Sequence, residues 1–194
     1  RKSIDDECKP ASELAIKRFA CKILDIDIDG VKTLQIIPKN VKKGRQILYL
    51  FGGGWTTGSP FNDLVISAQI ANYTKSTVFC PYYSLAPENP FPAALDDIFK
   101  VAKQLWSTSD NPPLLMGESA GATLAISLTH LLKKHGLVMP ARMGLLSPAS
   151  DLYNQGDSFS FNQNRDPILT LENVTAVSSI YAGNAKLDDP LLSP

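Results

Sequence analysis

A serine lies in a sequence setting that is typical of a reacting group. Residues 117–121 read Gly-Glu-Ser-Ala-Gly, with an apolar run at 114–116 before them and helical periodicity over 120–132 after them. This is the strand, tight turn and helix of a nucleophile elbow, which exposes a hydroxyl at a helix N-terminus. The glycines are needed because a Cβ beside the turn would clash with the strand or the helix. Ser119 is therefore the candidate catalytic nucleophile.

A triple glycine at 52–54 follows the apolar run 47–51 directly. Ligands of parallel sheets bind at the carboxyl ends of the strands, and glycines let bare N–H groups approach a ligand oxygen. Joined by the N–H of Ala120, these groups could form an oxyanion hole, in which one donor is typically worth about 3–4 kcal/mol. Two alternatives stay open, a loop that is small only for packing and a phosphate cradle. The cradle fits less well because no known phosphate-binding glycine spacing can be laid on this loop.

A serine needs a base to take its proton, and the histidines lie too far away to serve. His130 and His135 come 11 and 16 residues after Ser119 on the expected helix. At 1.5 Å per residue they lie on the order of 16 and 24 Å from it, whereas hydrogen-bond reach is about 3 Å. We expect them to be polar residues near the negative end of the helix dipole. The sequence thus provides neither a triad histidine nor an acid that can be assigned with it.

Strand and helix patterns alternate along the chain. Residues 24–28 and 31–37 flank Asp29-Gly30 and predict an antiparallel hairpin with one wet face. Short, continuously apolar runs predict strands buried on both faces, as in a parallel sheet, at 47–51, 77–80, 114–116 and 143–146. Helical spacing predicts helices between them, at 64–73, 95–105 and 120–132. The fold class is therefore α/β, with helices on both faces of a mostly parallel sheet.

The 194 residues suffice for one core, so we expect a single domain over 1–194. Residues 154–165 are polar and aperiodic and predict a surface excursion. A helix is expected to begin at Thr170 and end near Gly183. Segments 1–20 and about 154–182 are candidate cap or lid segments.

Composition excludes several classes of function. Lysine plus arginine balance aspartate plus glutamate at 19 each, and no basic run occurs, so a nucleic-acid partner is not expected. No apolar stretch approaches the roughly 20 residues that span a bilayer. Cys8, Cys21 and Cys80 are widely spaced and predict neither a disulfide framework nor a zinc site. We expect a cytoplasmic protein without a metal or cofactor.

Three motifs together resemble the hormone-sensitive-lipase-like branch of the α/β-hydrolases, which are serine esterases of carboxylic esters. FGGGW at 51–55 is similar to the family's H-G-G-G-W. YYSLAPENPFPAALDD at 82–97 is similar to its D-Y-R-L-A-P-E-x-P-F-P-A-A-x-x-D, and GESAGA at 117–122 to its G-D-S-A-G-G. The resemblance covers nearly the whole chain and implies the α/β-hydrolase fold.

The resemblance implies roles for individual residues. Ser119 would be the nucleophile, and the backbone N–H groups of Gly53, Gly54 and Ala120 would donate to the oxyanion. Asp96 and Asp97 are expected to pair locally rather than react.

Three residues depart from the family pattern. Phe51 stands where the family has histidine, Ser84 where it has arginine, and Glu118 where it usually has aspartate. Phe51 removes a polar anchor of the glycine loop, although the oxyanion donors are backbone groups. Activity is expected to be weakened or lost by this change.

Residues 188–194 resemble the family's D-P-x-x-S-P segment, which precedes the two strands that carry the acid and the histidine. We therefore expect these residues to be part of a longer hydrolase that lacks its last strands here. An uncovered sheet edge would then be open to a second copy or another partner.

The first hypothesis is an esterase that acts through an acyl-enzyme on small esters with short or medium acyl chains, inactive as this chain alone. The alternatives are a non-catalytic ligand-binding module on the same fold, since Phe51 and the missing base disfavour catalysis, and a peptidase or amidase.

Overall fold

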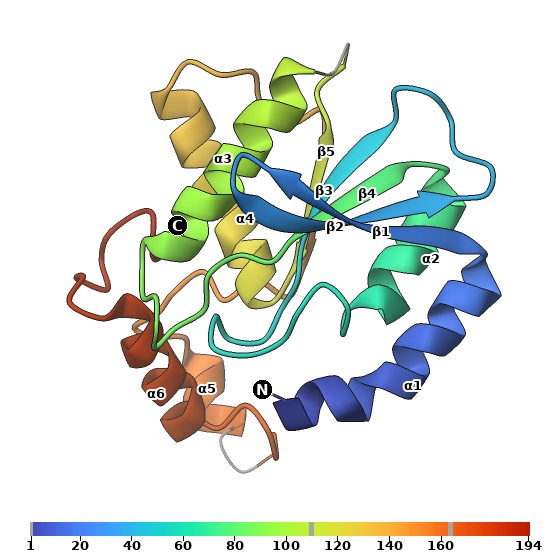
Figure 1. The fold of residues 1–194 in the computed structure, drawn as a ribbon. Coiled ribbons are helices and arrows are strands. Elements are labelled where there is room, and N and C mark those ends of the chain that lie inside the picture. The colour runs from blue at the N-terminus through green and yellow to red at the C-terminus, as the bar shows by residue number, and fades with distance from the viewer. Residues whose placement is uncertain (1, 109–110, 163–164) are drawn as a thin grey trace.

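The computed structural model describes residues 2–108, 111–162 and 165–194 (Figure 1). Within these residues six strands form one mixed sheet in the order β1-β2-β4-β3-β5-β6. The strands are β1 (Cys21–Ile28), β2 (Val31–Pro38), β3 (Gln46–Leu50), β4 (Thr77–Pro81), β5 (Leu114–Glu118) and β6 (Met143–Leu146). The pairs β4–β3, β3–β5 and β5–β6 are parallel, while β2 pairs antiparallel with both β1 and β4. The predicted α/β fold class is confirmed.

The first two strands form the predicted hairpin. Their register runs from Cys21 opposite Pro38 to Ile28 opposite Val31. Both turn residues, 29 and 30, have positive φ, of 52° and 80°. This conformation suits the Asp-Gly pair of a two-residue hairpin.

The central parallel strands are buried, as their unbroken apolarity predicts. Residues 47–50 of β3 are fully buried between helices on the two faces of the sheet. The prediction of burial on both faces is wrong for β6, where Met143, Leu145 and Leu146 are 39%, 40% and 42% exposed. The physical reason is its place at the edge, where no described strand pairs with its outer side.

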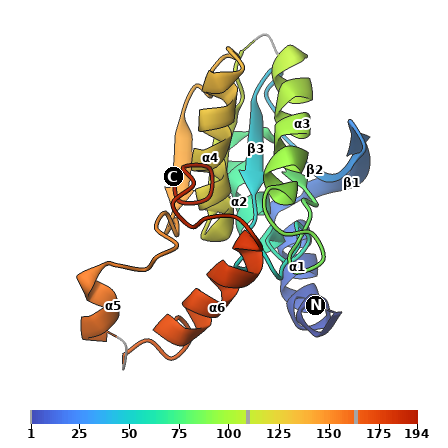
Figure 2. The same ribbon diagram turned by 90° about the vertical axis from the view of Figure 1, so that its left-hand side faces the viewer.

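Three helices lie in the predicted stretches. They are α2 (Leu64–Thr74), α3 (Ala93–Ser107) and α4 (Ala120–Lys134). Helix α4 packs on β3, β5 and β6 and against α3, whereas α2 packs on β2 and β4. Their arrangement around the strands can be followed in Figure 2.

Two helices lie where the sequence analysis assigned none. Helix α1 (Lys2–Phe19) packs against α2, with Ser12, Ala15 and Phe19 buried, and the Ser12 hydroxyl donates to the Phe61 carbonyl at 2.8 Å. Helix α5 (Asp157–Asn162) lies in the stretch interpreted as a surface excursion and has no buried residue.

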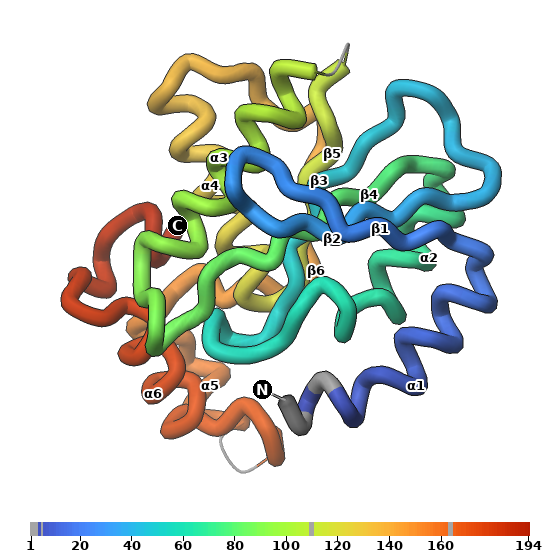
Figure 3. The backbone as a smooth tube through the Cα atoms, viewed as in Figure 1, coloured from blue at the N-terminus to red at the C-terminus, as the bar shows by residue number. Residues whose placement is uncertain are grey.

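Helix α6 (Leu171–Ala182) confirms the predicted caps. The Thr170 hydroxyl accepts a hydrogen bond from the Asn173 N–H at 3.2 Å, and Gly183 ends the helix with φ 57°. Helices α5 and α6 lie at the same end of the molecule, below the strands in Figures 1 and 2. The tube in Figure 3 shows the loop after β3 running to that end as well.

In the part of the chain that the structure describes, no helix combines the length and apolarity needed to cross a membrane.

Replacing Thr170 with alanine should loosen α6, because the side-chain cap of its first turn is lost. Removing such a cap costs about 1 kcal/mol, so amide exchange in 171–182 should speed up several-fold. The control is Thr175→Ala, an exposed position inside the same helix. Equal exchange in both variants would contradict the role of the cap.

Candidate active site

Ser119 occupies the turn between β5 and α4, as the elbow motif predicts. Its φ of 50° and ψ of −120° lie in a sparsely populated region that costs about 1–3 kcal/mol. Its N–H donates to the Leu146 carbonyl of β6 at 2.8 Å, and its carbonyl accepts from the Ala122 N–H at 2.9 Å. The strained turn is thus held by the sheet on one side and by the helix on the other.

The two glycines of the elbow are required by close backbone contacts. A Cβ at Gly121 would overlap the carbonyl oxygens of Leu50 and Phe51, and one at Gly117 would overlap the Gly121 carbonyl. The start of α4 therefore packs directly on the end of β3, with no side chain between them. This contact brings the elbow next to the glycine loop.

The glycine loop has backbone conformations that suit glycine. Gly53 and Gly54 have φ of 118° and 58°. The Gly53 carbonyl accepts from both the N–H and the hydroxyl of Thr57, each at 3.0 Å. The loop is therefore folded back on itself directly after β3.

One cavity of about 740 Å³ joins the elbow and the loop. Ser119, Gly53, Gly54 and Ala120 all line it, so the structure brings together every residue for which the sequence analysis predicted a catalytic role. Side chains from the candidate cap or lid segment at about 154–182, none of which the sequence analysis named as a site residue, complete a mostly apolar wall: Ile168, Leu169, Val174 and Val177. Their apolar character was visible in the sequence, but nothing local indicated which cavity they face.

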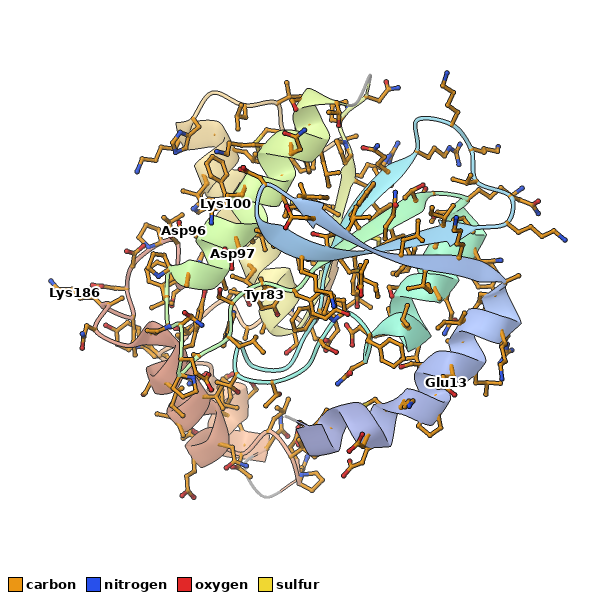
Figure 4. The ribbon with its side chains drawn as sticks, viewed as in Figure 1. Glu13, Tyr83, Asp96, Asp97, Lys100 and Lys186 are labelled. Atoms are coloured by element: carbon orange, nitrogen blue, oxygen red, sulfur yellow. The ribbon has the colours of Figure 1, made fainter. Side chains whose placement is uncertain are left out.

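Phe51 is anchored in a way that the sequence analysis did not foresee. Its ring stacks on Tyr83 with centroids 4.1 Å apart, and the Tyr83 hydroxyl donates to the Phe51 carbonyl at 2.7 Å. Burial raises the pKa of Tyr83 well above its usual range, so the phenol stays a donor. Tyr83 lies in the middle of the molecule in Figure 4. The phenyl ring of Phe51 offers no polar group, as expected, but the Tyr83 hydroxyl anchors the backbone of Phe51 at the start of the loop.

Asp97 pairs locally, as expected. Its Oδ2 accepts from the Ser84 N–H at 3.0 Å and from the Ser84 hydroxyl at 2.6 Å, and Lys100 Nζ lies 3.4 Å from Oδ1. Figure 4 labels Asp96, Asp97 and Lys100 together on α3. None of them lines the cavity.

Two carboxyl groups near the loop carry shifted pKa values that the sequence analysis did not predict. Burial raises the pKa of Asp63, and burial together with the charge of Asp63 raises that of Glu118. The Tyr49 hydroxyl opposes the shift at Asp63, and the N–H of Gly52, which faces both carboxyl groups, opposes both shifts. No local signal marks Asp63, because it meets the loop only in the folded chain.

The two histidines lie away from the cavity. His130 is exposed on α4, and His135 caps the far end of that helix, with its ring 4.9 Å from that of Phe99. Neither lines the cavity around Ser119. Among the described residues no group of three or more histidine, cysteine, aspartate or glutamate side chains is placed to hold a metal ion.

Comparison with known proteins identifies the family. The sequence profile described as the alpha/beta hydrolase fold matches residues 47–194. The chain belongs to the α/β-hydrolase fold family. Among solved structures, this α/β-hydrolase resembles a hormone-sensitive lipase homologue, EstE7, from a metagenome library, with a TM-score of 0.87 and 32% identity over 98% of this chain and 67% of that one. An esterase from the bacterial hormone-sensitive lipase family gives a TM-score of 0.89 and 30% identity over 100% of this chain and 67% of that one.

Curated relatives of this α/β-hydrolase are named as ester hydrolases. An esterase of Acinetobacter venetianus is 33% identical over 151 residues, covering 76% of this chain and 50% of the relative. An acetyl-hydrolase of Streptomyces hygroscopicus is 31% identical over 172 residues, covering 88% and 58%. The chain thus spans about half of the length of these relatives. The chain is thus similar to esterases, to acetyl-hydrolases and to homologues of hormone-sensitive lipase.

In this α/β-hydrolase, Gly121→Ala should be strongly destabilising, because the new methyl group meets two backbone carbonyls that cannot move independently. Overpacking of this kind costs about 1–3 kcal/mol or more, measured by urea unfolding. The matched control is Gly156→Ala, an exposed site whose nearest neighbour would lie 3.7 Å from the Cβ, and its stability should change by less than about 0.5 kcal/mol. Equal stability of the two variants would show that α4 and β3 do not pack as described.

Proposed function

We propose that the protein is a serine carboxylic-ester hydrolase in which Ser119 is the nucleophile. The observation that carries the proposal is the shared cavity: Ser119 lines it together with Gly53, Gly54 and Ala120. The esterase and acetyl-hydrolase names of the relatives support the reaction class.

The chemistry follows from these groups. Ser119 Oγ attacks the ester carbonyl, and the carbonyl oxygen becomes an oxyanion that accepts hydrogen bonds from the N–H groups of Gly53, Gly54 and Ala120. The alcohol leaves as the carbonyl reforms, which gives an acyl-enzyme. Water then attacks this ester and releases the acid. Such fixed donors act mainly on the transition state and so raise kcat.

The substrates we propose are small esters with short or medium acyl chains. The cavity of about 740 Å³ lies in the range of small-molecule sites and is mostly apolar toward α6. A wall of this kind favours an aliphatic chain over a charged group. The acetyl-hydrolase name of one relative points to the short end of this range.

The base that takes the Ser119 proton is not one of the two histidines of residues 1–194, for the reasons of position given above. We therefore expect residues 1–194 alone to hydrolyse esters no faster than their own Ser119→Ala variant. The measurement is release of p-nitrophenol from p-nitrophenyl acetate by both polypeptides. Turnover that depends on Ser119 in residues 1–194 alone would contradict this expectation.

A second candidate function is non-catalytic ligand binding on the same fold. It is favoured by the position of His130 and His135 and by the absence of the family histidine at Phe51. In that case the same cavity would hold a small apolar ligand without covalent chemistry.

A reducing, cytoplasmic setting is also proposed, supported by the free state of Cys8, Cys21 and Cys80.

A second copy or another partner is proposed to cover the exposed edge at β6, since Met143, Leu145 and Leu146 present apolar surface there.

In the full-length gene product, Ser119→Ala should abolish hydrolysis of p-nitrophenyl butyrate, with kcat/KM falling by at least a thousandfold, because the acyl acceptor is removed. It should also abolish labelling by a fluorophosphonate. The control is Ser107→Ala, an exposed serine at the end of α3. Hydrolysis and labelling that survive in Ser119→Ala would sink the assignment, and a wild-type protein that binds apolar esters without hydrolysis or labelling would favour the second candidate.

A further inference from the structure

Two carboxyl groups meet beneath the glycine loop, from elements that are far apart in the chain. Asp63 stands directly before α2, and Glu118 is the last residue of β5. The N–H of Gly52, the first glycine of the loop, faces both carboxyl groups. Glu118 Oε2 lies so close to Gly52 that a Cβ at this glycine would overlap it.

Asp63 is turned toward the loop and away from its own helix. It occupies the N-cap position of α2, where an aspartate side chain usually accepts from a helix N–H, yet it makes no such bond. Its Oδ2 accepts instead from the Tyr49 hydroxyl of β3 at 2.9 Å. The side chain thus gives up a stabilising cap and binds the end of β3 and the start of the loop.

Glu118 links the loop to the nucleophile. Its backbone ends β5 and is joined directly to Ser119, while its side chain reaches Gly52. One residue therefore connects the turn that carries the hydroxyl with the loop that carries the proposed oxyanion donors.

The pair is costly, which argues against an incidental contact. Among the described residues, neither carboxylate has a cation within ion-pair distance, and both are partly buried. The other titratable groups in this network are Tyr49, Tyr83 and Cys80, which carry no positive charge. Burying carboxylates without a cation is unfavourable unless hydrogen bonds compensate.

We propose that Asp63 and Glu118 are positioning residues that clamp the Gly52 N–H and thereby fix the donors of Gly53 and Gly54 relative to Ser119. The catalytic part of this inference rests on the proposed esterase function. The clamp itself is a property of the fold and can be measured without any substrate.

Amide exchange tests the clamp. Glu118→Leu removes the acceptor, and exchange in the peptide 51–57 should speed up at least tenfold, while β3 and β5 stay protected. Glu118→Gln keeps an acceptor oxygen and should show a smaller change. The matched control is Asp97→Asn, another partly buried carboxyl group that accepts from backbone and hydroxyl but faces Ser84, and it should leave 51–57 unchanged. Unchanged exchange at 51–57 in Glu118→Leu would overturn the clamp, whether or not the protein is an esterase.

Kinetics of the full-length gene product test the positioning. Per active site, counted by fluorophosphonate titration, Glu118→Leu and Asp63→Leu should lower kcat at least tenfold with KM changed less than threefold, because misplaced donors fail in the transition state. Glu118→Gln should recover part of kcat, and Asp97→Asn should match the wild type. Faster exchange with an unchanged kcat would refute the positioning role. A wild-type protein without hydrolysis would refute the proposed function and with it the catalytic role, while the exchange result still decides the clamp.

Stability against pH tests whether Glu118 is buried beside Asp63, as the clamp requires. The pKa of Glu118 is raised in the folded chain, so its contribution to stability is present below its unfolded pKa of about 4.3 and is lost as pH rises through the raised value. In Glu118→Gln this loss is removed, and Tm should fall less than in the wild type as pH rises from 4.5 to 7. An identical fall in both proteins would show that Glu118 is not buried beside Asp63, and the placement on which the clamp is argued would be wrong.

Discussion

The site depends on one backbone contact, the packing of Gly121 against the carbonyl oxygens at the end of β3. Because no side chain separates the two segments, the first turn of α4 and the last residues of β3 are fixed at van der Waals distance. The elbow ends at the first turn of α4, and the glycine loop begins at the end of β3. Their common cavity is thus a consequence of the sheet order, in which β3 and β5 are neighbours. A methyl group on Gly121 would therefore push the elbow and the glycine loop apart.

The glycine loop has no regular structure of its own and is held by side chains from several elements. Tyr83 binds the Phe51 carbonyl and Thr57 binds the Gly53 carbonyl, while the Gly52 N–H faces the carboxyl groups of Asp63 and Glu118. A loop anchored in this way can present N–H groups without rearranging during a reaction, which is what makes fixed donors effective. It also explains how phenylalanine can stand at position 51, since the anchoring is spread over other groups.

Features that depend on local pattern could be predicted from the sequence, and features that depend on distant contacts could not. The hairpin turn, the parallel strands, the Thr170 cap and the elbow each have a signal within a few residues. Helix α1 was missed although Ser12, Ala15 and Phe19 form a buried stripe at helical spacing, because its sequence is polar overall and contains Pro10. Helix α5 has no buried residue and therefore no apolar period to detect. The anchors of the loop come from residues up to 66 positions away, since Gly52 meets Glu118, and only the fold brings them together.

The wall of the cavity is coupled to the same loop. Trp55, directly after the glycines, stacks on Tyr181 of α6 with ring centroids 4.5 Å apart. The Tyr181 carbonyl in turn accepts from the Phe91 N–H at 2.8 Å, which ties α6 to the segment before α3. A displacement of α6 would therefore act on the residue that follows the glycines as well as on the apolar wall. Because of this coupling, the part of the cavity that would select a substrate of the proposed reaction and the part that would stabilise its oxyanion form one packed unit. Changes in α6 should therefore affect the rate of that reaction as well as the choice of substrate.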